Sequence, residues 1–194
     1  MIVESYVSGK KRVEICVDEY PENPRDAMAT LGTLWCWRRG WALGSRDESS
    51  EKSVDPSDYS GWDALYDAIV KQVKPVVILP VFMYEHGLVR LRTSSFSCPW
   101  DSGQIGFIFA RRSALEDFGA KIATKRVKER IEKALVAELQ TYEAYLNGDV
   151  YYFRVLEDGV LTDSCGGYYG RDEIPYMVET ALGAEEAKVA TLEQ

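Results

Sequence analysis

One short segment of the chain places a thiol, a carboxylate and an amide close together. It covers residues 96–104, reads Phe-Ser-Cys-Pro-Trp-Asp-Ser-Gly-Gln, and contains Cys98, Asp101 and Gln104. A cysteine nucleophile needs a base that takes its proton and a third group that orients the base. The one histidine of the chain, His86, precedes Cys98 by twelve residues. Cys98, His86 and Asp101 are therefore the candidate catalytic residues of a thiol hydrolase or transferase.

The same residues also have a structural interpretation, which the sequence favours. Asp101 can cap backbone amides of its own loop, while Phe96 and Trp100 can fill the core. A histidine beside glycine at a hairpin tip is more often an exposed turn residue, and Glu85 is a second carboxylate that could orient His86. The sequence alone does not decide whether the chain is an enzyme.

A metal site is a further alternative for the same histidine. Cys36, Cys98 and Cys165 with His86 would supply three sulfurs and one nitrogen, an acceptable set for structural zinc. These ligands come from four separate segments and the chain has no CxxC pair, so we predict no metal and no cofactor. The four cysteines are expected to be free thiols.

Aromatic and cationic side chains gather in residues 34–41, which read Leu-Trp-Cys-Trp-Arg-Arg-Gly-Trp. Indole and guanidinium planes together can stack a ring and bind an anion, as in a nucleotide-binding protein. Buried, Trp35 and Trp41 would be ordinary core residues. The candidate ligand-binding residues from this and the neighbouring segments are Trp37, Arg38, Arg39, Gln104 and Tyr168.

Tyr168 belongs to a third segment, residues 163–170, in which Gly166 and Gly167 follow Cys165. The two glycines favour a β-bulge over a ligand site. All three segments combine a cysteine with aromatic and small residues, which suit close packing. We expect them to share one centre.

The elements that must position these residues follow from periodicity. Apolar, β-branched runs at residues 76–84 and 88–94 flank a Glu-His-Gly turn and predict a hairpin with His86 at its tip. Val127, Ile131, Leu135 and Leu139 define the buried face of a long helix. Other predicted strands are residues 13–18, 105–110, 150–156 and 160–163, and other predicted helices are residues 62–73, 113–119 and 174–183.

The predicted fold is α+β, because the strands come in hairpins and do not alternate regularly with helices. It has a mainly antiparallel sheet packed against the long amphipathic helix and shorter helices. The length of 194 residues indicates a single domain over residues 1–183 with a frayed tail at residues 184–194. Residues 45–60 are expected to form an exposed loop.

The charge of the chain weakens one class of function. Lys and Arg number 23 against 31 Asp and Glu, a net charge of −8, which makes direct nucleic-acid binding an unfavoured function. No apolar run approaches the roughly 20 residues of a membrane helix, and no cationic leader precedes an apolar stretch. We expect a soluble protein of the cytoplasm.

Four strings of the sequence resemble a family of bacteriophage and prophage accessory proteins with no assigned chemistry. They are residues 31–39, the Met-Tyr-Glu-His-Gly turn at 83–87, residues 96–104 and residues 163–170. At position 37 the chain has Trp37 where the family has a histidine, which further weakens a metal site there. The resemblance implies an accessory protein in the host cytoplasm that binds a host protein, for example to inhibit a defence or nucleic-acid-processing enzyme. The cysteine enzyme and the nucleotide-binding protein remain alternatives.

Overall fold

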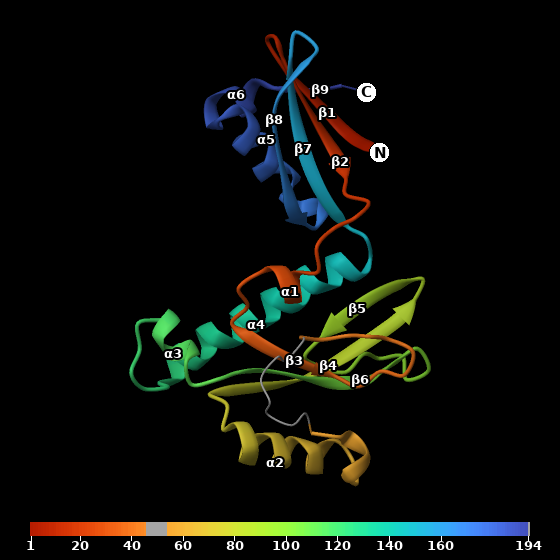
Figure 1. The fold of residues 1–194 in the computed structure, drawn as a ribbon, viewed down its shortest axis with the longest axis vertical. Coiled ribbons are helices and arrows are strands. Elements are labelled where there is room, and N and C mark those ends of the chain that lie inside the picture. Colours follow the sequence, from red (N-terminus) through yellow and green to blue (C-terminus); the bar gives the residue numbers. More distant parts are fainter. Residues whose placement is uncertain (46–53, 194) are drawn as a thin grey trace. The chain divides into compact units, whose positions relative to one another are not determined.

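The computed structural model describes residues 1–45 and 54–193, and these residues form two compact units (Figure 1). Unit 1 contains Met1–Pro24 and Ala144–Gln194, and unit 2 contains Arg25–Glu143. Each unit has its own antiparallel sheet, with helices packed on it, so the α+β fold is confirmed. That residues 1–183 behave as one domain stays a prediction.

Unit 1 is built on sheet A, whose strand order is β8-β7-β2-β1-β9. Its strands are β1 (Ile2–Ser8), β2 (Lys11–Val17), β7 (Val150–Glu157), β8 (Val160–Tyr169) and β9 (Thr191–Glu193). A 3-10 turn (Arg171–Glu173) leads into α5 (Ile174–Leu182) and α6 (Ala184–Val189). The residues expected as a frayed tail thus form α6 and β9, and β9 pairs with β1.

The core of unit 1 lies on the face of sheet A that α5 and α6 cover (Figure 1). Val13 and Ile15 of β2 pair with Val155 and Phe153 of β7, and all four are buried against Met177 of α5. Strict alternation places the residues between them on the opposite face. The alternating pattern that predicted β2 therefore reflects a sheet with one apolar face.

Unit 2 is built on sheet B, whose strand order is β3-β6-β4-β5. Its strands are β3 (Gly32–Cys36), β4 (Val77–His86), β5 (Leu88–Arg92) and β6 (Ser102–Ala110). Its helices are α1 (Pro24–Ala27), α2 (Trp62–Val73), α3 (Ala114–Asp117) and α4 (Lys125–Leu146), with a 3-10 turn at Pro56–Asp58. The predicted hairpin is confirmed, because β4 and β5 pair antiparallel through the turn at Gly87.

Helices cover both faces of sheet B, α2 on one and α4 on the other (Figure 1). Trp35 and Phe107 pack toward α2 with its buried Leu65. On the other face, α4 lies so close to β3 that a side chain at Gly32 would collide with Leu135. The predicted burial of Ile131, Leu135 and Leu139 is confirmed, at 0%, 0% and 2% exposure, while Val127 is only half-buried.

Two carboxylates of α4 also fix the two edge strands of sheet B. Glu138 accepts hydrogen bonds from the backbone N–H of Leu31 (2.5 Å), beside β3, and pairs with Arg25 (2.7 Å). Glu143 accepts from the N–H of Leu91 (2.5 Å) in β5 and pairs with Arg90 (2.8 Å). The edge strand that leads away from the His86 turn is thereby fastened to the helix.

The exposed loop expected at residues 45–60 lies partly outside the described residues, which omit 46–53. In the described remainder, Val54 is buried at 5% exposure and Pro56–Asp58 is a 3-10 turn. Among the helices of the described residues, none is both long enough and apolar enough to span a membrane.

Candidate functional site

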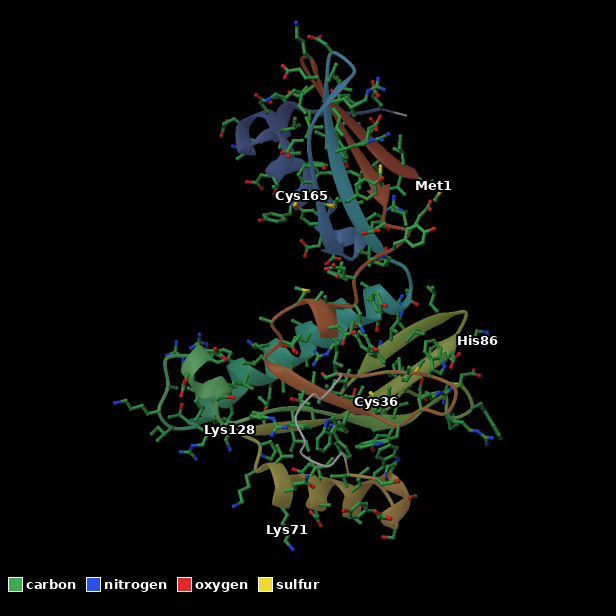
Figure 2. The ribbon with its side chains drawn as sticks, in the orientation of Figure 1. Met1, Cys36, Lys71, His86, Lys128 and Cys165 are labelled. Atoms are coloured by element: carbon green, nitrogen blue, oxygen red, sulfur yellow. The ribbon has the colours of Figure 1, made fainter. Side chains whose placement is uncertain are left out.

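The β4–β5 hairpin carries His86 at its tip, as predicted. His86 pairs with Leu88 across Gly87, which adopts the left-handed φ of +82° that a two-strand reversal at this point requires. The imidazole is 74% exposed (Figure 2). His86 is therefore open to solvent and to any partner of this hairpin.

Residues 93–101 connect β5 to β6 and bring Cys98 and Asp101 to the same tip. The backbone N–H of Glu85 donates to the carbonyl of Asp101 (2.9 Å), which fastens the loop to β4. The Ser102 hydroxyl donates to the carbonyl of Cys98 (2.5 Å), which closes the loop on itself. The predicted loop is thus ordered, although β6 already begins at Ser102.

The three candidate catalytic residues do converge, and the carboxylate lies in the middle. The Cys98 thiol donates to Asp101 Oδ2 (3.5 Å), and His86 Nδ1 lies 3.7 Å from the same oxygen. A thiol nucleophile needs the imidazole on its sulfur and the carboxylate behind the imidazole. In this structure the carboxylate lies between the thiol and the imidazole. Asp101 therefore connects the loop to the hairpin tip.

Two details of the structural interpretation are wrong. The Asp101 carboxylate contacts the Cys98 thiol and the imidazole, and not backbone amides of its loop. Trp100, expected to fill the core, is 92% exposed.

Other aromatic and apolar side chains surround the hairpin tip. The Tyr84 ring lies 5.6 Å from that of Phe96 and 6.4 Å from that of His86. The Arg92 guanidinium lies 4.9 Å from the centre of the Phe96 ring, and Leu88 is 54% exposed. We call the tip surface the set of exposed side chains His86, Leu88 and Trp100 together with the half-buried Phe96, all of which belong to the β4–β5 hairpin or to the loop that follows it.

The Trp-Arg cluster of residues 34–41 is mostly committed to structure. Trp35 is buried, and Trp37 lies 6.3 Å from Trp35 and 6.4 Å from Trp62 between ring centres. Burial raises the pKa of the Cys36 thiol to about 12, against the opposing effect of Arg25, so this thiol is neutral at pH 7.

The remaining candidate ligand residues do not form one site. Arg38 pairs with Glu85 (2.8 Å) next to the hairpin tip, while Arg39 is exposed. Gln104 donates to the backbone of its own strand, at the carbonyl of Gly106 (3.4 Å). Two of the three predicted segments therefore meet where β3 pairs with β6, and the backbone N–H of Trp37 donates to the carbonyl of Ile105 (2.7 Å), next to Gln104.

The third segment lies in unit 1, within β8. Tyr168 packs against Phe153 and Tyr176, with ring centres 5.9 Å and 6.3 Å away. Gly167, at φ +83°, is the extra residue of a β-bulge against β7, so the bulge is confirmed. Cys165 is exposed and belongs to this sheet (Figure 2).

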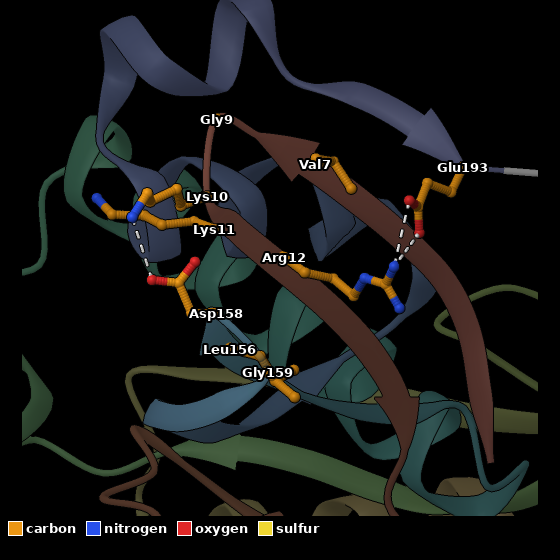
Figure 3. Close-up of a pocket in the computed structure, with 9 residues that line it drawn as sticks. All are labelled: Val7, Gly9, Lys10, Lys11, Arg12, Leu156, Asp158, Gly159 and Glu193. Atoms are coloured by element: carbon orange, nitrogen blue, oxygen red, sulfur yellow. Dashed lines mark hydrogen bonds and ion pairs between the residues drawn. The ribbon is translucent and has the colours of Figure 1, made fainter.

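Unit 1 has a pocket of about 370 Å³ at the turns of its two hairpins, which three cationic side chains line (Figure 3). Each of these cations has a carboxylate partner: Lys10 with Asp158 (3.3 Å), Lys11 with Glu186 (3.1 Å) and Arg12 with Glu193 (3.3 Å). A ligand anion would have to displace these carboxylates. The tip surface of unit 2 is therefore the better candidate site.

Comparisons with family models, with curated proteins and with solved structures give no match to this chain. The resemblance to phage accessory proteins stays a prediction. In the described part of the chain, no three His, Cys, Asp or Glu side chains group so that they could hold a metal ion. All four cysteines are free.

The residue that sequence reasoning missed is Trp100. Its signal was local: the indole stands between Pro99 and the polar pair Asp101-Ser102 in a segment between strands. A tryptophan in such a connection has no apolar periodicity to direct it inward.

Proposed function

We propose that this protein acts by binding a protein partner through the tip surface of unit 2. The observation that carries the proposal is Trp100, which is 92% exposed on a loop that hydrogen bonds hold in place. An exposed tryptophan leaves a large apolar area in water and packs against nothing. When an interface buries it, the same side chain is among the largest contributors to the free energy of binding.

The surroundings of Trp100 suit an interface. Leu88, beside the turn that carries His86, is a second exposed apolar side chain, and His86 and Arg92 are exposed donors on the same hairpin. Apolar anchors within a polar rim are the usual composition of a specific interface. Because Asp101 and Glu85 already fix the loop, little conformational entropy is lost when a partner binds.

This proposal agrees with the accessory protein that the family resemblance predicts. Such a protein would act in the host cytoplasm on a host component, and inhibition of a defence or nucleic-acid-processing enzyme is part of the proposal. The acidic side chains of unit 1 fit the occupation of a basic enzyme face.

The test compares three proteins in pull-downs from host lysate at low and high salt. Wild type and Trp41→Ala, a matched change at an indole that is only 36% exposed, should retain the same specific partner. Trp100→Ala should bind this partner at least tenfold more weakly, which corresponds to a loss of about 1.4 kcal/mol of binding free energy. Its free energy of unfolding should stay within about 0.5 kcal/mol of wild type. No specific partner at either salt, or one that Trp100→Ala retains, would refute the proposal.

A cysteine enzyme is the second candidate, favoured by the convergence of Cys98, Asp101 and His86. It requires the imidazole to move from Asp101 onto the sulfur when substrate binds. Intact-mass analysis after mild iodoacetamide treatment tests it: an activated Cys98 reacts faster than a free thiol, and faster than Cys98 in His86→Gln. Equal rates would exclude it.

A further inference from the structure

The net charge of the chain is divided unevenly between its two units. Unit 1 has 6 Lys and Arg against 15 Asp and Glu, a net charge of −9. Unit 2 has 17 against 16, a net charge of +1. The sum of −8, which disfavours phosphate binding by the chain as a whole, therefore belongs to unit 1.

Within unit 2, the cations gather where α3 leads into α4. Residues 111–133 contain 8 Lys and Arg against 4 Asp and Glu. Figure 1 shows α3 beside the N-terminal part of α4, and the Arg130 guanidinium lies 4.8 Å from the centre of the Phe118 ring at the end of α3. We call this region the basic patch; its cations are Arg111, Arg112, Lys121, Lys125, Arg126, Lys128, Arg130 and Lys133.

Most cations of the basic patch are not used within the fold. The side chains without an ion pair or hydrogen bond to any described residue are Arg112, Lys121, Arg126, Lys128 and Lys133. Lys125 has one long contact to Glu129 (4.0 Å) and is 93% exposed. This differs from the pocket of unit 1, where every cation is paired with a carboxylate.

Helix geometry aligns part of the patch. Arg126, Arg130 and Lys133 follow the i, i+4, i+7 spacing, so they form one stripe about 10 Å long on the side of α4 opposite its buried face. Lys128 is exposed and projects from a different side of α4 than Arg130, because the two are only two residues apart on the helix (Figure 2). The positive end of the helix dipole lies at the same end of α4.

The chemistry of the patch selects among polyanions. The apolar face of α4 is packed on sheet B, so this helix has no apolar face to insert into a lipid surface. The patch has one exposed large apolar side chain, Ile122 at 68%, whereas a protein interface needs an apolar centre. Binding to a nucleic-acid backbone is the association that cations alone can support.

We propose that the basic patch of α3 and α4 binds the phosphate backbone of nucleic acid without reading its sequence. This inference does not depend on the tip surface, which is formed by other residues of unit 2. The protein would then have two binding surfaces, the tip surface for a protein partner and the basic patch for nucleic acid, which is the substrate of nucleic-acid-processing enzymes.

Fluorescence anisotropy of a short dye-labelled DNA strand and its duplex tests the proposal on the full chain. At about 150 mM salt we expect a Kd in the non-specific range of about 10⁻⁴ to 10⁻⁶ M, with tighter binding at about 50 mM salt and weaker binding at about 200 mM salt. Arg126→Glu with Lys133→Glu should weaken binding at least tenfold. The control with the same charge change is Lys71→Glu on α2 (Figure 2) with Lys74→Glu at the C-cap of this helix, and its binding should stay within about twofold of wild type.

Three outcomes would overturn the proposal. The first is no binding of wild type at low salt, and the second is equal weakening by the α2 control, which would show a general charge effect. The third is binding to phosphatidylserine vesicles, or to a second copy of the chain in sizing experiments, with none to DNA or RNA. Tryptophan fluorescence of both variants establishes that unit 2 remains folded, since all five tryptophans belong to this unit.

Discussion

Sheet A and sheet B are both antiparallel, but helices cover one face of sheet A and both faces of sheet B (Figure 1). Sheet B lies between α2 and α4, and its strand β4 reads as an almost continuous apolar run. Sheet A packs one face on α5 and α6, where Val13 and Ile15 of β2 are buried, while the other face of β2 carries Glu14 and Cys16. The continuous apolar run of β4 thus reflects a sheet that is covered on both faces, which is the pattern expected for a strand buried on both sides.

The two sheets also bury charge differently. In sheet A, Glu14 pairs with Arg154 (2.5 Å), whose side chain is 40% exposed. In unit 2, Arg25 is 1% exposed, pairs with Glu138 and donates to the carbonyl of Gly32. The Arg25 guanidinium of unit 2 is therefore desolvated in its ion pair, whereas the Arg154 guanidinium of unit 1 is partly hydrated.

The largest effect should come from Glu138→Gln. The change removes the carboxylate that Arg25 faces and that accepts from the amide of Leu31, which should cost about 3 to 5 kcal/mol of unfolding free energy. The matched control is Glu143→Gln on the same helix, whose partner Arg90 is 55% exposed and whose ion pair should contribute at most about 1 kcal/mol. Urea unfolding followed by tryptophan fluorescence measures both, and equal losses would show that burial of the pair is not the cause.

The second prediction tests whether the two cores are independent. Leu135→Ala in unit 2 and Met177→Ala in unit 1 truncate fully buried side chains and should each cost about 2 to 5 kcal/mol. Because all five tryptophans are in unit 2, only Leu135→Ala should shift the fluorescence transition, while circular dichroism detects both losses.

The control for these two changes is Val136→Ala, beside Leu135 on α4 but 36% exposed, which should cost under about 0.5 kcal/mol. If Met177→Ala moves the tryptophan transition as far as Leu135→Ala does, the units unfold together. The chain would then be the single domain that its length predicts.

Local patterns predicted most elements because each depends on neighbours in sequence. The stripe from Ile131 to Leu139 and the hairpin around His86 are of this kind. The division into two units does not depend on neighbours in sequence. Strand β2 pairs with β7, and the whole of unit 2 separates these two strands along the chain. No periodicity encodes which strands pair across such a separation.

The site shows the same limit. The hairpin and the short connection to β6 permitted Cys98, Asp101 and His86 to meet but did not require it. The order of their contacts and the exposure of Trp100 depend on loop torsions that residue types do not determine. In β3, Trp35 is buried among aromatic rings, as its interpretation as a core residue predicts, whereas Trp41, which the same interpretation placed in the core, is 36% exposed.

The last prediction concerns the stability of unit 1 at alkaline pH, and it expects no change in stability near pH 7. Burial, with hydrogen bonds to Glu4 and Asp149, raises the pKa of Tyr6 and of Tyr151 in unit 1 from 10.0 to about 12. Burial and Cys165 raise the pKa of Tyr168 to about 12 as well. These phenols keep their protons in the folded state where the unfolded chain has lost them.

Between pH 10 and 12 the folded state therefore binds more protons than the unfolded state, so the free energy of unfolding falls as pH rises through this window. Below pH 10 the contribution is fully present. Circular dichroism and tyrosinate absorbance should show unit 1 losing structure as these tyrosines ionise. Tyr6→Phe keeps the ring, removes one titrating hydroxyl and should make the loss less steep. Ionisation of all twelve tyrosines near pH 10, with the fold intact, would contradict the burial of these three hydroxyls.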